Sequence, residues 1–242
     1  MQKIDVCFSP MMYPAYRDDD AVVVIVDIFR ASTSMCTALA NGASAIIPVA
    51  SVEKAEAYKE QGYLVGAERN VMKCDFADFG NSPFDYTKEA VEGKDIVFTT
   101  TNGTKAIEVA SNAVRVIVGA FINIGAVAEY CLQTKRDVVV LCAGWNDKFC
   151  MEDTLFAGAL ANLLVETGEY MHASDAAFVA NEMWLTHEEH IENYLSISDH
   201  YERLVQNNLA DSVEYCLSTD IVNVVPELHD EDGTMILLAA TE

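Results

Sequence analysis

The chain has 242 residues and a mass of 26.6 kDa, and 51% of its residues are hydrophobic, so it can bury a sizeable core and is not disordered. Its 15 basic and 38 acidic residues give a formal net charge of −23, which argues against nucleic acid or an anionic membrane as a partner. No apolar run approaches the roughly 20 residues of a membrane span and no secretory signal opens the chain, so we expect a soluble, cytoplasmic protein.

Residues 22–26 form an apolar run that stops abruptly at polar side chains. This pattern predicts a central parallel strand, and ligands in open α/β sheets bind just beyond the carboxyl ends of such strands. Asp27 and Arg30 would lie there, with Ser32 and Thr33 opening a helix over residues 35–40. The alternatives are a local ion pair between Asp27 and Arg30 and a helix N-cap formed by the hydroxyl side chains.

Residues 51–60 predict a helix, with Ser51 as its N-cap and Gly62 just past its end. A short strand over residues 63–66 then leads to an acid and a base, Glu68 and Arg69. The stretch up to Pro83 has no periodicity and reads as a long loop. Long loops in compact domains are often functional, so we include Asn81 and Ser82 among the candidate site residues.

Two further segments repeat the order of strand, small polar loop and helix. The strand over residues 94–98 leads into a polar loop and a helix over 105–111, and the strand over 137–142 leads through Gly144 to a helix over 152–164. Small residues let backbone N–H groups approach an anion, and the following helix dipole favours it. In the first of these loops the candidate residues are Thr101, Asn102, Gly103 and Thr104.

The rest of the chain predicts strands over residues 114–119, 220–226 and 234–239, with an acidic turn at 229–233, and helices over 124–134, 173–184 and 200–218. No Pro/Gly-rich linker interrupts the chain. We therefore predict one α/β unit over residues 1–242, with a layered, mostly parallel sheet and flanking helices; an arrangement in two lobes is the alternative.

Four carboxylates at the predicted strand exits and helix starts are oxygen ligands suited to Mg²⁺. Arg30 and Arg69 could clamp an anion bidentately, and a bound cation would offset the repulsion between an anionic ligand and this acidic chain. The alternative for Glu152 and Asp153 is that they only favour a helix N-terminus. The candidate metal ligands are Asp27, Glu68, Glu152 and Asp153.

The ordered set of these motifs resembles the 2-phosphosulfolactate phosphatase family. The matching segments, which run from near residue 20 to about residue 165, are 27–33, 38–43, 80–83, 100–104, 142–144 and 152–153, and the tail at 200–211 and 224–226 is also similar. The resemblance implies a Mg²⁺-dependent hydrolase that converts 2-phosphosulfolactate to 3-sulfolactate and phosphate on the route to coenzyme M. The residues that match the family and rank highest as candidates for the site are Asp27, Arg30, Asn102, Glu152 and Asp153.

The sequence leaves two alternatives to this function: a phosphatase for another small phosphorylated acid, and a non-catalytic anion-binding domain. Phosphoryl transfer depends mostly on positioning and charge stabilisation, so direct attack by water and a phosphoenzyme on Asp27 both stay open, and we favour water. We expect a small anionic substrate and a homo-oligomer.

Overall fold

The sheet is built around β2 (Val22–Val26), whose five residues are all buried. Its neighbours β7 (Arg115–Gly119) and β8 (Val138–Cys142) run parallel to it. These strands are rich in valine and isoleucine because a parallel strand covered on both faces has no side exposed to water. The computed structural model describes residues 1–240.

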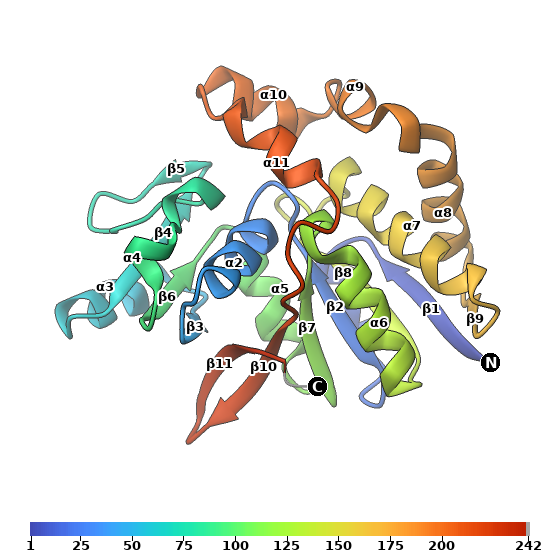
Figure 1. Ribbon diagram of the computed structural model, residues 1–242, viewed down its shortest axis with the longest axis horizontal. Helices are drawn as coiled ribbons and strands as arrows, with labels where there is room; N and C mark the ends of the chain where they lie inside the picture. The colour runs from blue at the N-terminus through green and yellow to red at the C-terminus, as the bar shows by residue number, and fades with distance from the viewer. Residues whose placement is uncertain (241–242) are drawn as a thin grey trace.

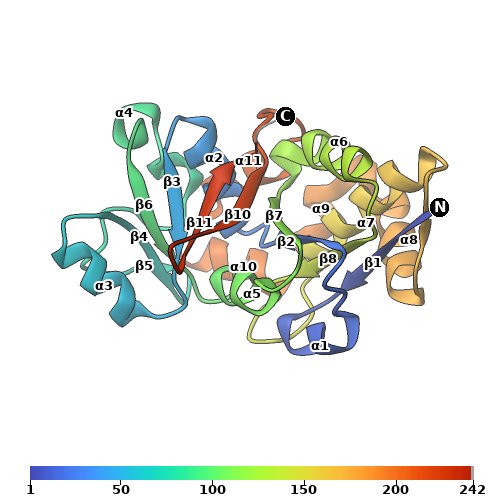
Figure 2. The same ribbon diagram turned by 90° about the horizontal axis from the view of Figure 1, so that it is seen from below.

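A hairpin of β10 (Pro226–Glu231) and β11 (Thr234–Ala239) joins two parallel groups of strands. It pairs with β3 (Ala45–Pro48) on one side and with β7 on the other, through one residue pair each (Figure 2). The strand order is β5-β4-β6-β3-β11-β10-β7-β2-β8-β1-β9. The remaining strands are β1 (Gln2–Cys7), β4 (Leu64–Arg69), β5 (Met72–Lys73), β6 (Asp95–Thr99) and β9 (Tyr170–His172).

Three helices start shortly after strand ends: α2 (Ala31–Ala40) after β2, α5 (Gly103–Ala110) after β6, and α7 (Met151–Glu166) after β8. Near the C-terminus, α9 (Ile191–Leu195), α10 (Asp199–Gln206) and α11 (Val213–Leu217) lie above the strands (Figure 1). The others are α1 (Tyr13–Tyr16), α3 (Val52–Glu60), α4 (Lys88–Val91), α6 (Ile124–Thr134) and α8 (Asp175–His187).

The predicted α/β class, with a mostly parallel sheet and flanking helices, is confirmed. The two-lobed alternative is not, because the hairpin continues the sheet between the two parallel groups of strands. The predicted cap of α3 is also confirmed, since the Ser51 side chain accepts a hydrogen bond from the N–H of Lys54 at 3.1 Å. Within residues 1–240, no helix is both long and apolar enough to cross a lipid bilayer.

Three predictions near the C-terminus are wrong. Residues 220–225 are not a strand, because the N–H of Val222 bonds to the carbonyl of Ile122 and the carbonyl of Val224 accepts from Asn123, which ties this segment to the start of α6. The acidic residues 229–231 lie inside β10, and the turn is at Asp232 and Gly233. The single helix over 200–218 is broken at Asn208, whose φ of +56° is left-handed.

Candidate active site

A small pocket lies where loops from both parallel groups of strands meet α10. Its walls come from the ends of β2, β4, β6 and β8 and from the loops that follow them. The enclosed volume is about 10 Å³, roughly the room that one water molecule needs. The lining residues are Asp27, Phe29, Arg30, Glu68, Val71, Asn81, Asn102, Trp145 and His200.

Asp27 is held by the turn into α2. Its N–H donates to Ser32 Oγ at 2.6 Å, and the N–H of Ala31 donates to Asp27 Oδ1 at 3.4 Å. A Cβ atom at Gly103 would lie 2.9 Å from Asp27 Oδ2, so only glycine lets α5 start this close to the carboxylate. Burial raises the pKa of Asp27 to about 6, and the charge of Glu68 adds to the rise. A cation in the pocket would stabilise this carboxylate.

Glu68 ties β4 to the polar loop after β6. It accepts hydrogen bonds from the N–H of Val71 at 2.5 Å and from the N–H and hydroxyl of Thr101 at 3.3 and 3.1 Å. The neighbouring Arg69 turns the other way, because its guanidinium donates to Thr99 Oγ1 at 2.9 Å and to the carbonyl of Ala50 at 3.3 Å. The structure therefore brings Glu68, but not Arg69, into the lining of the pocket.

Arg30 and Asn81 bring incompletely paired polar atoms to the pocket. Both residues are buried, and neither Arg30 Nη1 nor Asn81 Oδ1 has a hydrogen-bond partner among residues 1–240. The remaining contact of the guanidinium is long, 3.5 Å from Nη2 to the carbonyl of Val71. Burial lowers the pKa of Arg30, but an arginine keeps its charge at neutral pH. An unpaired buried donor is costly, so this arrangement suits an anionic ligand.

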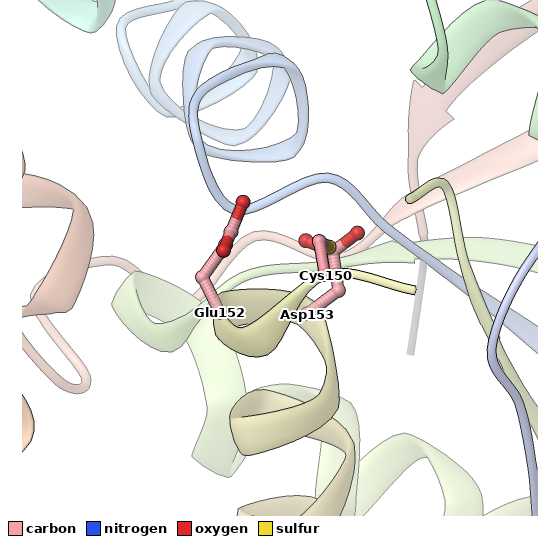
Figure 3. Close-up of side chains that lie close together, drawn as sticks. All are labelled: Cys150, Glu152 and Asp153. Carbon is pink, nitrogen blue, oxygen red and sulfur yellow. The ribbon is translucent and has the colours of Figure 1, made fainter. Parts of the chain in front are cut away.

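The start of α7 carries Cys150, Glu152 and Asp153, whose ligand atoms lie within 4.8 Å of one another (Figure 3). Both oxygens of Asp153 are occupied, since they accept from the N–H groups of Ile28 at 2.9 Å and of Gly144 at 3.0 Å. Asp153 thus joins the loops that follow β2 and β8, and burial raises its pKa to about 8. Glu152 differs, because its Oε2 atom has no hydrogen-bond partner in the described part of the chain. Burial also holds the pKa of the Cys150 thiol well above its ordinary value.

His200 is a site residue that sequence reasoning did not single out. It lies on α10 and its Nδ1 is 2.7 Å from Glu152 Oε1. Its ring packs edge-on against Phe29 and lies 5.5 Å from the ring of Trp145. Burial lowers the pKa of His200, but the hydrogen bond and charge of Glu152 outweigh burial and raise it above the ordinary value. The sequence of α10 looks like that of a surface helix, so only the tertiary contact with Glu152 reveals this residue.

Comparisons with known proteins identify the family of the chain. The family model described as 2-phosphosulpholactate phosphatase matches residues 7–231. The chain belongs to the 2-phosphosulfolactate phosphatase family. A Thermotoga maritima protein is 38% identical over 94% of this chain and 96% of its own length, and a Carboxydothermus hydrogenoformans protein is 38% identical over 97% of both. A Clostridium novyi protein is 36% identical over 94% of this chain and 97% of its own length. Each is named "Probable 2-phosphosulfolactate phosphatase".

This family consists of phosphoric monoester hydrolases, and the resemblance seen in the sequence is confirmed. In this member of the 2-phosphosulfolactate phosphatase family, several predicted substrate-binding residues do not line the pocket. The Thr33 hydroxyl donates to the carbonyl of Ile28, and the Thr104 hydroxyl to the carbonyl of Thr100. These contacts brace the loops that carry Asp27 and Asn102. The predicted residues that do not line the pocket are Ser32, Thr33, Arg69, Ser82, Thr101, Gly103, Thr104 and Gly144.

Proposed function

We propose that the protein hydrolyses the phosphate ester of 2-phosphosulfolactate to 3-sulfolactate and phosphate in a Mg²⁺-dependent reaction, as a step toward coenzyme M. The observation that carries this proposal is the pocket lined by Asp27 and Arg30, in a chain of this family, together with the buried Glu152, which bonds to the lining residue His200 and keeps one oxygen without a partner among residues 1–240. A cytoplasmic location, a homo-oligomeric state and the absence of nucleic-acid and membrane partners stay predictions from the sequence.

The residues at the pocket fit a magnesium ion. Asp27, Glu68, Glu152 and Asp153 are all buried, whereas Arg30 is the one lining residue among residues 1–240 with a permanent positive charge. Buried carboxylates in such excess are neutralised either by protons or by a cation, and a divalent cation would let them stay ionised. Asp27 and Glu152 would hold the ion, because Glu68 and Asp153 already accept several hydrogen bonds. When bound, Mg²⁺ would supply positive charge against the phosphoryl oxygens.

The protein's own groups have distinct tasks in this proposal. Arg30 donates its free N–H groups to the phosphoryl oxygens and so orients the ester. Water attacks phosphorus, the bond from phosphorus to the ester oxygen breaks, and the ester oxygen leaves with a proton as the hydroxyl of 3-sulfolactate. An aspartyl phosphate on Asp27 is the alternative to direct attack, and trapping labelled protein in a single turnover would reveal it.

The assay that tests the function is release of inorganic phosphate from 2-phosphosulfolactate with Mg²⁺ and with a chelator. We expect turnover with Mg²⁺, loss of turnover on chelation, and recovery when Mg²⁺ is restored. Faster hydrolysis of another phosphorylated acid, such as 2-phospholactate or phosphoglycolate, would favour the broader phosphatase alternative. Binding of these compounds without any phosphate release would favour the non-catalytic alternative.

We also expect the stabilising effect of Mg²⁺ to depend on pH. The raised pKa values of Asp27, about 6, and Asp153, about 8, mean that the metal-free folded chain keeps protons that the unfolded chain releases. Its free energy of unfolding therefore falls as pH rises from about 4 to about 8. Saturating Mg²⁺ binds the deprotonated carboxylates and should raise the melting temperature by roughly 5 °C at pH 8, and less at pH 5.5. Calorimetry with and without Mg²⁺ at both pH values measures this rise in melting temperature. An equal rise at both pH values would contradict the prediction.

A further inference from the structure

The roof of the pocket is the face of α10 that carries His200 and, one turn later, Arg203. His200 lines the pocket, and both residues contact Trp145 on the loop after β8. The pocket has room for about one water molecule, so a phosphorylated three-carbon acid enters only if the groups around it shift. Apart from Glu68 in β4, the lining residues lie on loops and on α10, and we take α10 and the Trp145 loop as the parts that move to admit substrate.

The charges of the pocket do not match all the acidic groups of the proposed substrate. 2-Phosphosulfolactate carries a phosphoryl group, a carboxylate and a sulfonate. Within the described part of the chain, Arg30 is the only lining residue with a permanent positive charge, and a divalent cation would neutralise charge on the phosphoryl group. The carboxylate is attached to the carbon that bears the ester, whereas the sulfonate is one carbon further away. The sulfonate therefore extends furthest from the phosphoryl group.

Arg203 is a second cation at this roof, and it has no acidic partner. Its guanidinium carbon lies 3.9 Å from the centroid of the Trp145 ring. Its Nε atom is buried without a hydrogen-bond partner, and no carboxylate among residues 1–240 forms an ion pair with it. Stacking on an aromatic ring leaves the edge of a guanidinium free for an anion.

We infer that Arg203 is a substrate-binding residue that pairs with the sulfonate when α10 closes over the bound substrate. This inference rests on the proposed function and assigns the part of the substrate that distinguishes it from simpler phosphorylated acids. The competing interpretation is that Arg203 only holds α10 in place by packing on Trp145. Loss of such a structural contact would weaken binding of every substrate alike, whereas loss of a sulfonate contact would weaken binding only of substrates that carry a sulfonate.

The test compares 2-phosphosulfolactate with 2-phospholactate, which lacks the sulfonate. Arg203→Met keeps an apolar stem on Trp145 and removes the charge. We expect it to raise KM for 2-phosphosulfolactate about 10- to 100-fold, as expected for the loss of a charged hydrogen bond. For 2-phospholactate, KM and kcat should change less than about threefold, within the range of ordinary contact loss. Arg203→Lys retains the charge, so its KM for 2-phosphosulfolactate should lie between that of the wild type and that of Arg203→Met.

Isothermal titration with 3-sulfolactate and Mg²⁺ supplies a measurement that needs no turnover. Arg203→Met should weaken this binding by the same factor by which it raises KM for 2-phosphosulfolactate. Glu202→Gln, a change on the exposed side of the same helix, should leave the binding unchanged. Equal losses on both substrates, or unchanged 3-sulfolactate binding in both Arg203 variants, would overturn the inference. Absence of phosphate release from 2-phosphosulfolactate by the wild-type protein would instead overturn the proposed function.

Discussion

Replacing Asp27 by asparagine is expected to lower turnover of 2-phosphosulfolactate by about a thousandfold or more, in the range seen when one essential charge-stabilising group is removed. Asparagine has the same shape and keeps an oxygen for the N–H of Ala31, so the turn into α2 should stay intact. The substitution removes a buried carboxylate whose charged form is disfavoured by burial. The melting temperature should therefore stay within a few degrees or rise, as differential scanning calorimetry would show.

A matched control for this variant is Asp78→Asn. Asp78 accepts hydrogen bonds from Lys59 and from the N–H of Val65, and it does not line the pocket. This variant should lose some stability and keep turnover within a fewfold of wild type. The affinity for Mg²⁺ should fall in Asp27→Asn and not in Asp78→Asn. If Asp27→Asn retained full activity, the proposed roles of Asp27 would have to be abandoned.

Arg30→Ala is expected to cause the second large loss, about a hundred- to a thousandfold in kcat/KM, because it removes a charged donor that meets the phosphoryl group only in the pocket. The cost in stability should be small, since Arg30 makes a single long hydrogen bond and its charge is disfavoured by burial. Steady-state kinetics with Mg²⁺, together with thermal melting, measures both effects. Arg30→Lys should recover part of the activity but not the bidentate geometry.

Arg69→Ala is the informative control, because Arg69 follows Glu68 in the sequence but points away from the pocket. Loss of its hydrogen bonds to Thr99 and Ala50 should lower the melting temperature, while kcat/KM should fall no more than a fewfold. Equal losses of activity for Arg30→Ala and Arg69→Ala would show that both arginines reach the substrate, and would contradict the division of roles seen in the structure.

The sequence predicts only part of the site. Asp27 and Arg30 were identified because an apolar strand has to end where polar side chains begin, and this boundary is local. Glu152 and Asp153 were predicted as equivalent ligands, because they are neighbours at one helix start. The structure separates them: Asp153 accepts two backbone N–H groups, whereas Glu152 pairs with His200 and keeps one free oxygen.

By itself, the sequence determined the α/β class, most strands and helices, the family, and the loops from which the pocket is made. These features depend on hydrophobic periodicity, small polar residues and helix caps, which act over a few neighbouring residues. Only the tertiary structure decided that the β10–β11 hairpin joins two groups of strands, and that His200 and Arg203 roof the pocket. Such contacts join residues far apart along the chain, such as Glu152 and His200, and no local pattern records them.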